Sequence, residues 1–156
     1  MIRLALVRHA KSDWGDPALP DHDRPLNARG LSDAPRMAEQ FAASGFTPEA
    51  ILSSTALRAR TTAEFFSTAL GTPVRLQRRL YGASASDLLR SATESDCRAV
   101  MVVAHDPGMT ALAAALSRDR IEHMPTCAVA TFTWDTDDWA VVDAVDPADW
   151  SHHTPR

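Results

Sequence analysis

At 156 residues, with 45% hydrophobic and 23% charged residues, the chain fits one domain with a sizeable core and an ordinary surface. Its formal net charge of −4 argues against a nucleic-acid-binding protein, because such proteins carry an excess of positive charge. No stretch approaches the roughly 20 apolar residues that span a bilayer, and the N-terminal apolar run is too short for a signal peptide. The two cysteines, Cys97 and Cys127, are too few for a disulfide framework. We expect both to be reduced and buried, in a cytoplasmic protein.

Short apolar runs alternate with helical patterns along the chain, which predicts an α/β fold. The runs predict buried strands over residues 2–7, 50–53, 74–76 and 99–104. The patterns between and after them predict helices over residues 32–44, 56–70, 85–95 and 107–116. Together they indicate a three-layer arrangement, in which helices flank a mostly parallel central sheet.

The helix boundaries follow from residues that cap helices. Ser32 is expected to cap the first helix, with Pro35 in its first turn, because proline lacks the amide that an interior position requires. A start near Asn27 would need a kink at that proline. Ser54 or Thr55 is the expected cap of the second helix.

The last part of the chain has a different pattern. Two strand-like runs, 128–134 and 139–146, flank an acidic turn, which predicts an antiparallel hairpin at the edge of the sheet. The tail over 147–156 is expected to be a loosely packed end. The predicted fold class is thus a single α/β domain over residues 1–156, with a C-terminal edge hairpin.

Basic residues follow three of the predicted strands. Arg8 and His9 come directly after the first, Arg58 lies in the first helical turn after the second, and His105 directly follows the fourth. Ligands of open α/β sheets bind beyond the carboxyl ends of the strands. Each of these residues alone is commonly a surface charge, but together with helix N-termini they predict an anion site suited to phosphate.

Several short blocks carry a resemblance to a known family. They read LVRHAKS at 6–12, DRPL at 23–26 with RG at 29–30, SS at 53–54 with RA at 58–59 and Thr62, VAH at 103–105 with PG at 107–108, and PT at 125–126. In this order they resemble the signature of the histidine phosphatase superfamily, and more specifically the SixA-type phosphohistidine phosphatases. The resemblance spans nearly the whole chain and favours Arg58 over Arg60 as the second arginine of the site.

The resemblance implies a metal-independent phosphatase in which His9 attacks phosphorus and holds a phosphohistidine intermediate. Arg8, Arg58 and His105 would bind the phosphate oxygens. For this attack His9 must be neutral, and a backbone carbonyl that accepts from its other ring N–H would hold the required tautomer. The implied substrate is phosphohistidine on a protein, such as a phosphorelay or phosphotransfer component.

One stretch departs from the family's pattern. Mutase and phosphomonoesterase relatives usually carry an acid after the second helix, which protonates an alcohol leaving group. Residues 80–87 contain no Glu, and their only carboxylate, Asp87, is expected to cap the third helix. A missing acid suits a phosphoramidate substrate, because a protonated imidazole leaves more readily than an alkoxide. A phosphatase of a small phosphorylated metabolite and a non-catalytic phosphate-binding module remain alternatives, although a binder does not need the nucleophile His9.

The other polar residues give weaker signals. The acids of the proline-rich loop match no calcium-binding pattern, so a solvated loop is expected for Asp13, Asp16, Asp21 and Asp23. Surface positions are expected for the histidines that lack paired metal ligands, namely His22, His123, His152 and His153. Lys11 and Ser12 lie beside the first block and are candidates for substrate contact. We expect a monomer with no cofactor, no metal, and no nucleic-acid or membrane partner.

Overall fold

A six-stranded sheet forms the centre of the molecule, in the order β3-β2-β4-β1-β5-β6. The computed structural model describes all residues, 1–156. Four strands run parallel to one another: β1 (Ile2–Arg8), β2 (Ala50–Ser53), β3 (Val74–Leu76) and β4 (Ala99–Ala104). At one side of the sheet, β5 (Val129–Trp134) pairs antiparallel with β1, and β6 (Asp149–His153) pairs antiparallel with β5.

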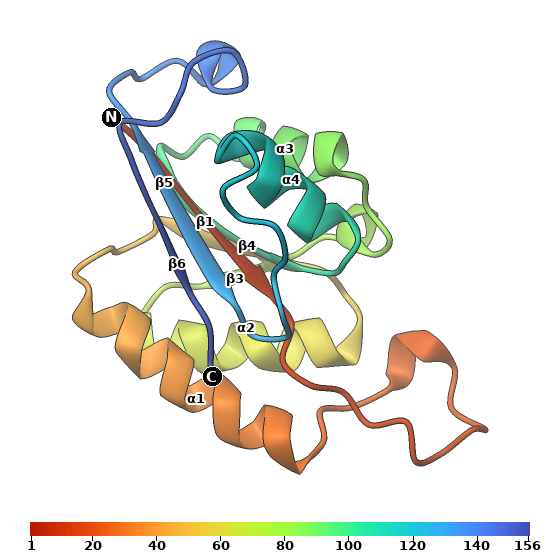
Figure 1. Ribbon diagram of the computed structural model, residues 1–156. Helices are drawn as coiled ribbons and strands as arrows, with labels where there is room; N and C mark the ends of the chain where they lie inside the picture. The colour runs from red at the N-terminus through yellow and green to blue at the C-terminus, as the bar shows by residue number, and fades with distance from the viewer.

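Helices cover both faces of this sheet, which confirms the predicted three-layer α/β fold. One face carries α1 (Ala28–Ala43) and α2 (Leu57–Leu70), and the other carries α3 (Ala85–Thr93) and α4 (Gly108–Leu116) (Figure 1). Because successive side chains of a strand point to opposite faces, Leu4 and Leu6 of β1 join the core under α3 and α4. Ala5 and Val7 join the core under α1 and α2. The continuous apolar runs of the strands are thus explained by burial on both sides.

The carboxyl ends of β1, β2 and β4 lie at the same edge of the sheet, because these strands are parallel and adjacent. The long connection over residues 9–27 leaves β1 at this edge and projects beyond it, drawn in red and orange in Figure 1. It contains the short 3-10 turn η1 (Asp21–Asp23). Gly30, in the first turn of α1, packs so closely on this connection that a Cβ atom would lie 2.2 Å from the Lys11 carbonyl oxygen.

The prediction for the start of α1 is wrong by about one turn. The helix begins at Ala28, and the side chain of Asn27 caps it by accepting a 2.9 Å hydrogen bond from the amide of Gly30. Asn27 satisfies a free amide at the helix start, which Ser32 was expected to do, and Pro35 lies inside the helix. Leu31, in this added first turn, is half exposed.

The predicted caps of the next two helices are also wrong. α2 has Ala56 at its N-cap position, without a side-chain hydrogen bond, because Ser54 and Thr55 instead bond to His105 and His22. α3 is capped by Ser84, which accepts from the amide of Asp87, so Asp87 lies in the first turn rather than at the cap.

The antiparallel edge pair is present, but its second strand lies further along the chain than predicted. Trp139–Val141 forms the 3-10 turn η3, and the Trp139 indole N–H donates to the Cys97 carbonyl at 2.8 Å. This packing removes the region from the sheet edge, and β6 takes its place beside β5. The tail is therefore not loose, and Arg156 forms an ion pair with the buried Asp33 at 2.6 Å.

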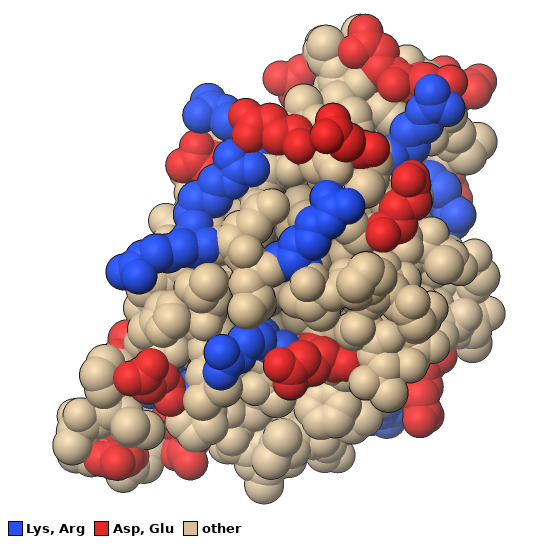
Figure 2. Space-filling view, turned by 180° about the vertical axis from the view of Figure 1, so that it is seen from behind, with Lys and Arg blue, Asp and Glu red and all other residues tan.

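Both cysteines are free and buried, as predicted. None of the helices combines the length and the apolar character that a bilayer crossing requires. On the face seen in Figure 2, acidic and basic side chains are interspersed, and no extended region carries positive charge alone.

Candidate active site

His9 lies immediately beyond β1, where two backbone hydrogen bonds hold it. Its amide donates to the Ala104 carbonyl at the end of β4, and its carbonyl accepts from the amide of Cys127, both at 3.0 Å. The Nδ1 atom of the ring lies 2.7 Å from the Ala10 carbonyl oxygen. A carbonyl can only accept, so Nδ1 carries the proton, and Nε2 retains a free lone pair.

The surroundings of His9 keep its ring uncharged. The side chain is 7% exposed, and burial lowers the pKa of His9 to about 3. The bond to Ala10 opposes this shift, whereas repulsion by His105 when it is protonated, and by the charges of Arg58 and Arg8, adds to it. His9 is therefore neutral near pH 7, with an unprotonated nitrogen beside two arginines.

The second histidine, His105, lies at the end of β4, and its ring centroid is 5.0 Å from that of His9. Its Nε2 atom lies 2.8 Å from the hydroxyl of Ser54, which follows β2. Burial, and next the charge of Arg58, lower the pKa of His105 to about 4. The structure thus brings together two histidines that the sequence separates by more than ninety positions.

The two predicted arginines lie beside the histidine pair and are both held by oxygen atoms. Arg8 donates through Nη1 to the Met124 carbonyl at 2.9 Å and lies 3.5 Å from the carboxylate of Asp106. Arg58 is 6% exposed and donates through Nη1 to the backbone carbonyl of Asp21 at 2.7 Å. The Nε atoms of both arginines are buried without a hydrogen-bond partner. All four predicted site residues therefore lie together at one edge of the sheet.

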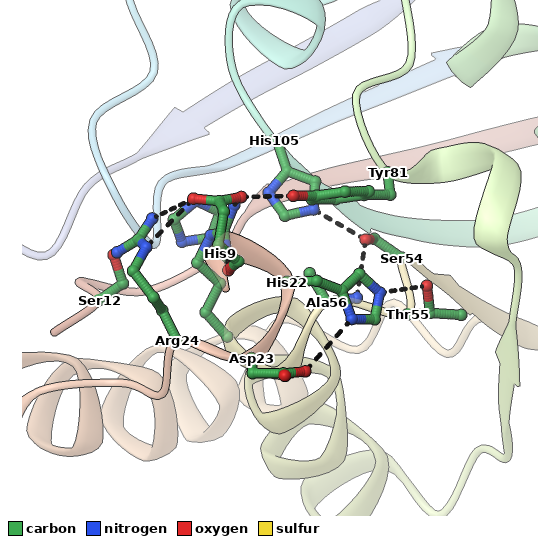
Figure 3. Close-up of polar contacts among 12 residues, drawn as sticks. His9, Ser12, His22, Asp23, Arg24, Ser54, Thr55, Ala56, Tyr81 and His105 are labelled. Carbon is green, nitrogen blue, oxygen red and sulfur yellow. Dashed lines mark hydrogen bonds and ion pairs between the residues drawn. The ribbon is translucent and has the colours of Figure 1, made fainter. Parts of the chain in front are cut away.

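Three side chains outside the predicted set form a cluster with Arg58, centred on the carboxylate of Asp21. Asp21, expected to be a solvated loop acid, accepts hydrogen bonds from Arg58 at 2.9 Å, from Arg24 at 3.1 Å and from Tyr81 at 2.5 Å. Arg24 and Tyr81 approach the space beside His9 from opposite sides (Figure 3). The hydrogen bond from Tyr81, and next those from Arg58 and Arg24, hold the pKa of Asp21 well below its usual range. Arg24 stood in the DRPL block, which was the one sequence signal for it.

The remaining candidates lie at the rim or away from the site. Ser12 accepts a 2.6 Å hydrogen bond from Arg24, so it supports the site, whereas the side chain of Lys11 makes no hydrogen bond or ion pair. His22 is half-buried rather than an isolated surface residue, since it bonds to Thr55 at 2.8 Å and packs edge-on against Tyr81. The other three histidines take no part in the site: His123, His152 and His153.

The other loop acids and Asp87 are placed differently from Asp21. Asp13 and Asp16 accept from nearby backbone amides of their own loop. Asp87 is half exposed and lies 3.8 Å from Arg90 on the same helix. No group of three His, Cys, Asp or Glu side chains has the arrangement of a metal site.

Comparison with known proteins identifies a matching family and relatives of similar sequence. The family model of the histidine phosphatase superfamily (branch 1) matches residues 4–87. An uncharacterized protein of Mycobacterium tuberculosis is 33% identical over 162 aligned positions, covering 96% of this chain and all (100%) of that protein. An uncharacterized chloroplastic protein of Arabidopsis thaliana is 30% identical, covering 95% of this chain and 74% of that protein.

Solved structures extend the likeness. A candidate phosphohistidine phosphatase, SixA, from Agrobacterium tumefaciens is 29% identical, with a TM-score of 0.79 over 97% of this chain and 94% of that chain. The protein histidine phosphatase SixA solved with tungstate is 22% identical, with a TM-score of 0.76 over 98% of this chain and 95% of that chain, and that likeness bears on the fold alone. On the family model and on its near full-length relatives, the chain belongs to the histidine phosphatase superfamily (branch 1).

Proposed function

We propose that the protein hydrolyses phosphohistidine on another protein, without a metal ion, through a phosphoryl group bound covalently to Nε2 of His9. The observation that carries this proposal is the hydrogen bond from Nδ1 of His9 to the Ala10 carbonyl. It leaves Nε2 unprotonated, and burial keeps the ring neutral at the pH at which the protein would work. Superfamily membership and the likeness to phosphohistidine phosphatases support a phosphatase of this kind.

In the first step, the lone pair of Nε2 forms a bond to phosphorus as the bond to the substrate's imidazole nitrogen breaks. The leaving ring keeps that electron pair and departs neutral, because it was protonated at its other nitrogen. Water then attacks the phosphoryl group on His9, which releases inorganic phosphate and restores the neutral histidine.

The charge that develops on the phosphoryl oxygens needs donors that are already in position. Arg8 and His105 are held in position near His9 by hydrogen bonds to Met124 and Ser54, and Arg58 is held at the same edge of the sheet by Asp21. Removal of one preorganised donor of this kind costs about 3–4 kcal/mol of barrier height. A phosphoryl group on His9 would thus be stabilised in both steps.

A phosphoramidate is favoured over an alcohol phosphate because no carboxylic acid is free to protonate a leaving group. Asp21 is held ionised by its three donors. Asp106 lies 3.5 Å from Arg8 and accepts from Thr110, and Asp87 is half exposed on α3. General acid catalysis is worth ~10²–10⁴-fold, and an imidazole that leaves neutral does not depend on it.

A comparison of substrates tests this proposal. We expect kcat/KM for a phosphohistidine peptide or phosphoramidate to exceed that for a simple alkyl phosphate by at least about 100-fold. p-Nitrophenyl phosphate should fall between them, because its leaving group needs little protonation. Equal rates with an alkyl phosphate, lost selectively in Asp87→Asn, would make Asp87 the acid and a small phosphorylated metabolite the substrate.

Trapping of the intermediate tests the role of His9 directly. After brief reaction with labelled phosphoramidate, label should be found on His9, stable to alkali and labile to acid. A folded His9→Ala variant should lose both label and turnover. Retained turnover in that variant would refute the nucleophile, and an absence of turnover in the wild-type protein would favour a binding module.

A further inference from the structure

The carboxylate of Asp21 is surrounded by one donor from its own loop and by two donors from distant parts of the chain. Its Oδ2 atom accepts from Nη2 of Arg58 at 2.9 Å and from the hydroxyl of Tyr81 at 2.5 Å. Its Oδ1 atom accepts from Nε of Arg24 at 3.1 Å, and Nη2 of Arg24 is also 3.1 Å away. Two guanidinium groups and a phenol around one carboxylate make an anion-binding arrangement.

Arg58 belongs to this arrangement and to the proposed phosphate site at once. Nη1 and Nη2 of Arg58 are both engaged by Asp21, through its backbone carbonyl and its carboxylate. Arg58 lies in the first turn of α2, at the same edge of the sheet as His9 and His105, and its charge also lowers the pKa values of both histidines. When a phosphoryl group binds next to His9, the guanidinium of Arg58 is therefore already hydrogen-bonded to the carboxylate of Asp21.

Packing contacts hold Tyr81 in a position from which its hydroxyl can donate a hydrogen bond to an anion. Its ring packs edge-on against His105, with centroids 5.5 Å apart, and against His22 at 4.9 Å. Thr55 holds the ring of His22 through the bond at 2.8 Å. The segment after Tyr81 is pressed against the start of α4, where a Cβ atom on Gly108 would lie 2.2 Å from the Ala83 carbonyl. Tyr81 is also 37% exposed, so it remains accessible from solvent.

We propose that Tyr81 is a phosphate-binding residue, and that Asp21 is an internal carboxylate that occupies Tyr81 and Arg58 until the substrate's phosphoryl group displaces it. This inference rests on the proposed function for the place where phosphate binds. A phosphoryl group offers three oxygens and up to two negative charges, whereas the carboxylate offers two oxygens and one charge. The same donors therefore bind the phosphoryl group more strongly once both compete for them.

A direct binding measurement tests the inference without requiring turnover. Tungstate binding to the full-length protein is measured by calorimetry. Asp21→Ala should tighten binding about tenfold, the change that a competing interaction of ~1.4 kcal/mol produces. The matched control is Asp23→Ala, an exposed acid of the same 3-10 turn, which should change affinity less than about twofold because it only reduces the screened overall charge. Unchanged or weaker binding in Asp21→Ala would overturn the competition.

The role of Tyr81 is tested in a variant that lacks the carboxylate of Asp21. In the wild-type protein the Tyr81 hydroxyl donates to Asp21 before the anion binds and to the anion afterwards, so its removal affects both states. In Asp21→Ala protein, Tyr81→Phe should weaken tungstate binding about tenfold, while in the wild-type protein the same change should have a smaller effect. Equal affinity with and without the hydroxyl in the Asp21→Ala background would refute the role of Tyr81. If Asp21→Ala fails to fold, Asp21→Asn removes the charge with the same expected direction.

Failure of this inference can be separated from failure of the proposed function. Arg58→Ala should abolish most tungstate binding if phosphate binds where the proposed function requires. Normal tungstate binding in Arg58→Ala would contradict the phosphate site itself. Lost binding in Arg58→Ala, together with no gain in Asp21→Ala, would refute only the internal carboxylate.

Discussion

The amide of Ala10 donates a 3.0 Å hydrogen bond to the hydroxyl of Thr62, a buried residue of α2 fifty-two positions away. The carbonyl of the same Ala10 accepts the hydrogen bond from Nδ1 of His9. The Thr62 hydroxyl in turn donates to the Arg58 carbonyl at 2.8 Å. Thr62 thus connects the turn that orients His9 to the helix that carries Arg58.

We expect Thr62→Val to weaken both stability and catalysis. Valine has nearly the same shape as threonine, but it leaves the buried Ala10 amide without an acceptor, which costs about 1–3 kcal/mol. The free energy of unfolding should fall by this amount, and phosphorylation of His9 should slow. The matched control is Thr61→Val at the preceding, less buried position of α2. This substitution should change neither the free energy of unfolding nor the rate of His9 phosphorylation. Equal effects of the two substitutions would contradict the connection.

Arg58 and Arg60 provide a second test. Arg58 is buried against Asp21, whereas Arg60 is half-buried and its side chain makes no hydrogen bond or ion pair. We expect Arg58→Ala to lower kcat/KM at least 100-fold, about 2.7 kcal/mol, and Arg60→Ala to have a much smaller effect. Steady-state kinetics with phosphoramidate measures both. The reverse order would show that the wrong arginine has been assigned to the phosphate.

The buried histidines predict how stability depends on pH. Burial lowers the pKa of His9 to about 3 and that of His105 to about 4, from 6.5 in the unfolded chain. Between these values and 6.5 the unfolded chain binds protons that the folded chain does not, so stability falls as the pH falls below 6.5. Each histidine contributes a slope of about 1.4 kcal/mol per pH unit. Carboxylates such as Asp21 add their effect only at lower pH.

Urea unfolding at about pH 7, 6 and 5 measures this slope. Replacement of both histidines by glutamine should remove most of it, because glutamine does not titrate. Replacement of the exposed His153 is the control and should leave the slope unchanged. A double variant with the wild-type slope would mean that other groups cause the pH dependence.

Metal independence is the fourth prediction. The proposed phosphate donors are arginines and histidines, and no three candidate ligands have the arrangement of a metal site. Turnover should therefore persist after dialysis against EDTA, and vanadate should inhibit by occupying the same donors. If chelation abolishes turnover and Mg²⁺ or Zn²⁺ restores it, a metal takes part in the reaction.

The parallel strands of the sheet and the location of the candidate site could be predicted from local patterns in the sequence. Residues 2–7 and 99–104 are apolar enough to be read as doubly covered strands, and parallel strands end at one edge. Since His9 and His105 directly follow two such strands, their proximity could be predicted without coordinates. The expectation of a carbonyl beside the ring N–H of His9 followed from the nucleophile role that the family resemblance implies, and only the structure identified Ala10.

Other features depended on contacts that no local pattern records. Asp21 and Tyr81 are sixty positions apart in the sequence. From the sequence an acid in a loop is expected to be solvated, and only the fold places Arg58 in contact with Asp21. Residues 139–146 have a strand-like pattern, yet the Trp139 indole bonds to Cys97 and takes that segment out of the sheet. β6 has the polar sequence DWSHH, and an edge strand needs mainly backbone hydrogen bonds, which almost any residue supplies. The sequence by itself thus determined β1 to β5, most helices and the four candidate site residues at the edge of the sheet, because burial and strand ends are local properties. Only the tertiary structure decided the partners of Asp21 and the course of the C-terminal segment, because those depend on which distant groups compete for the same bonds.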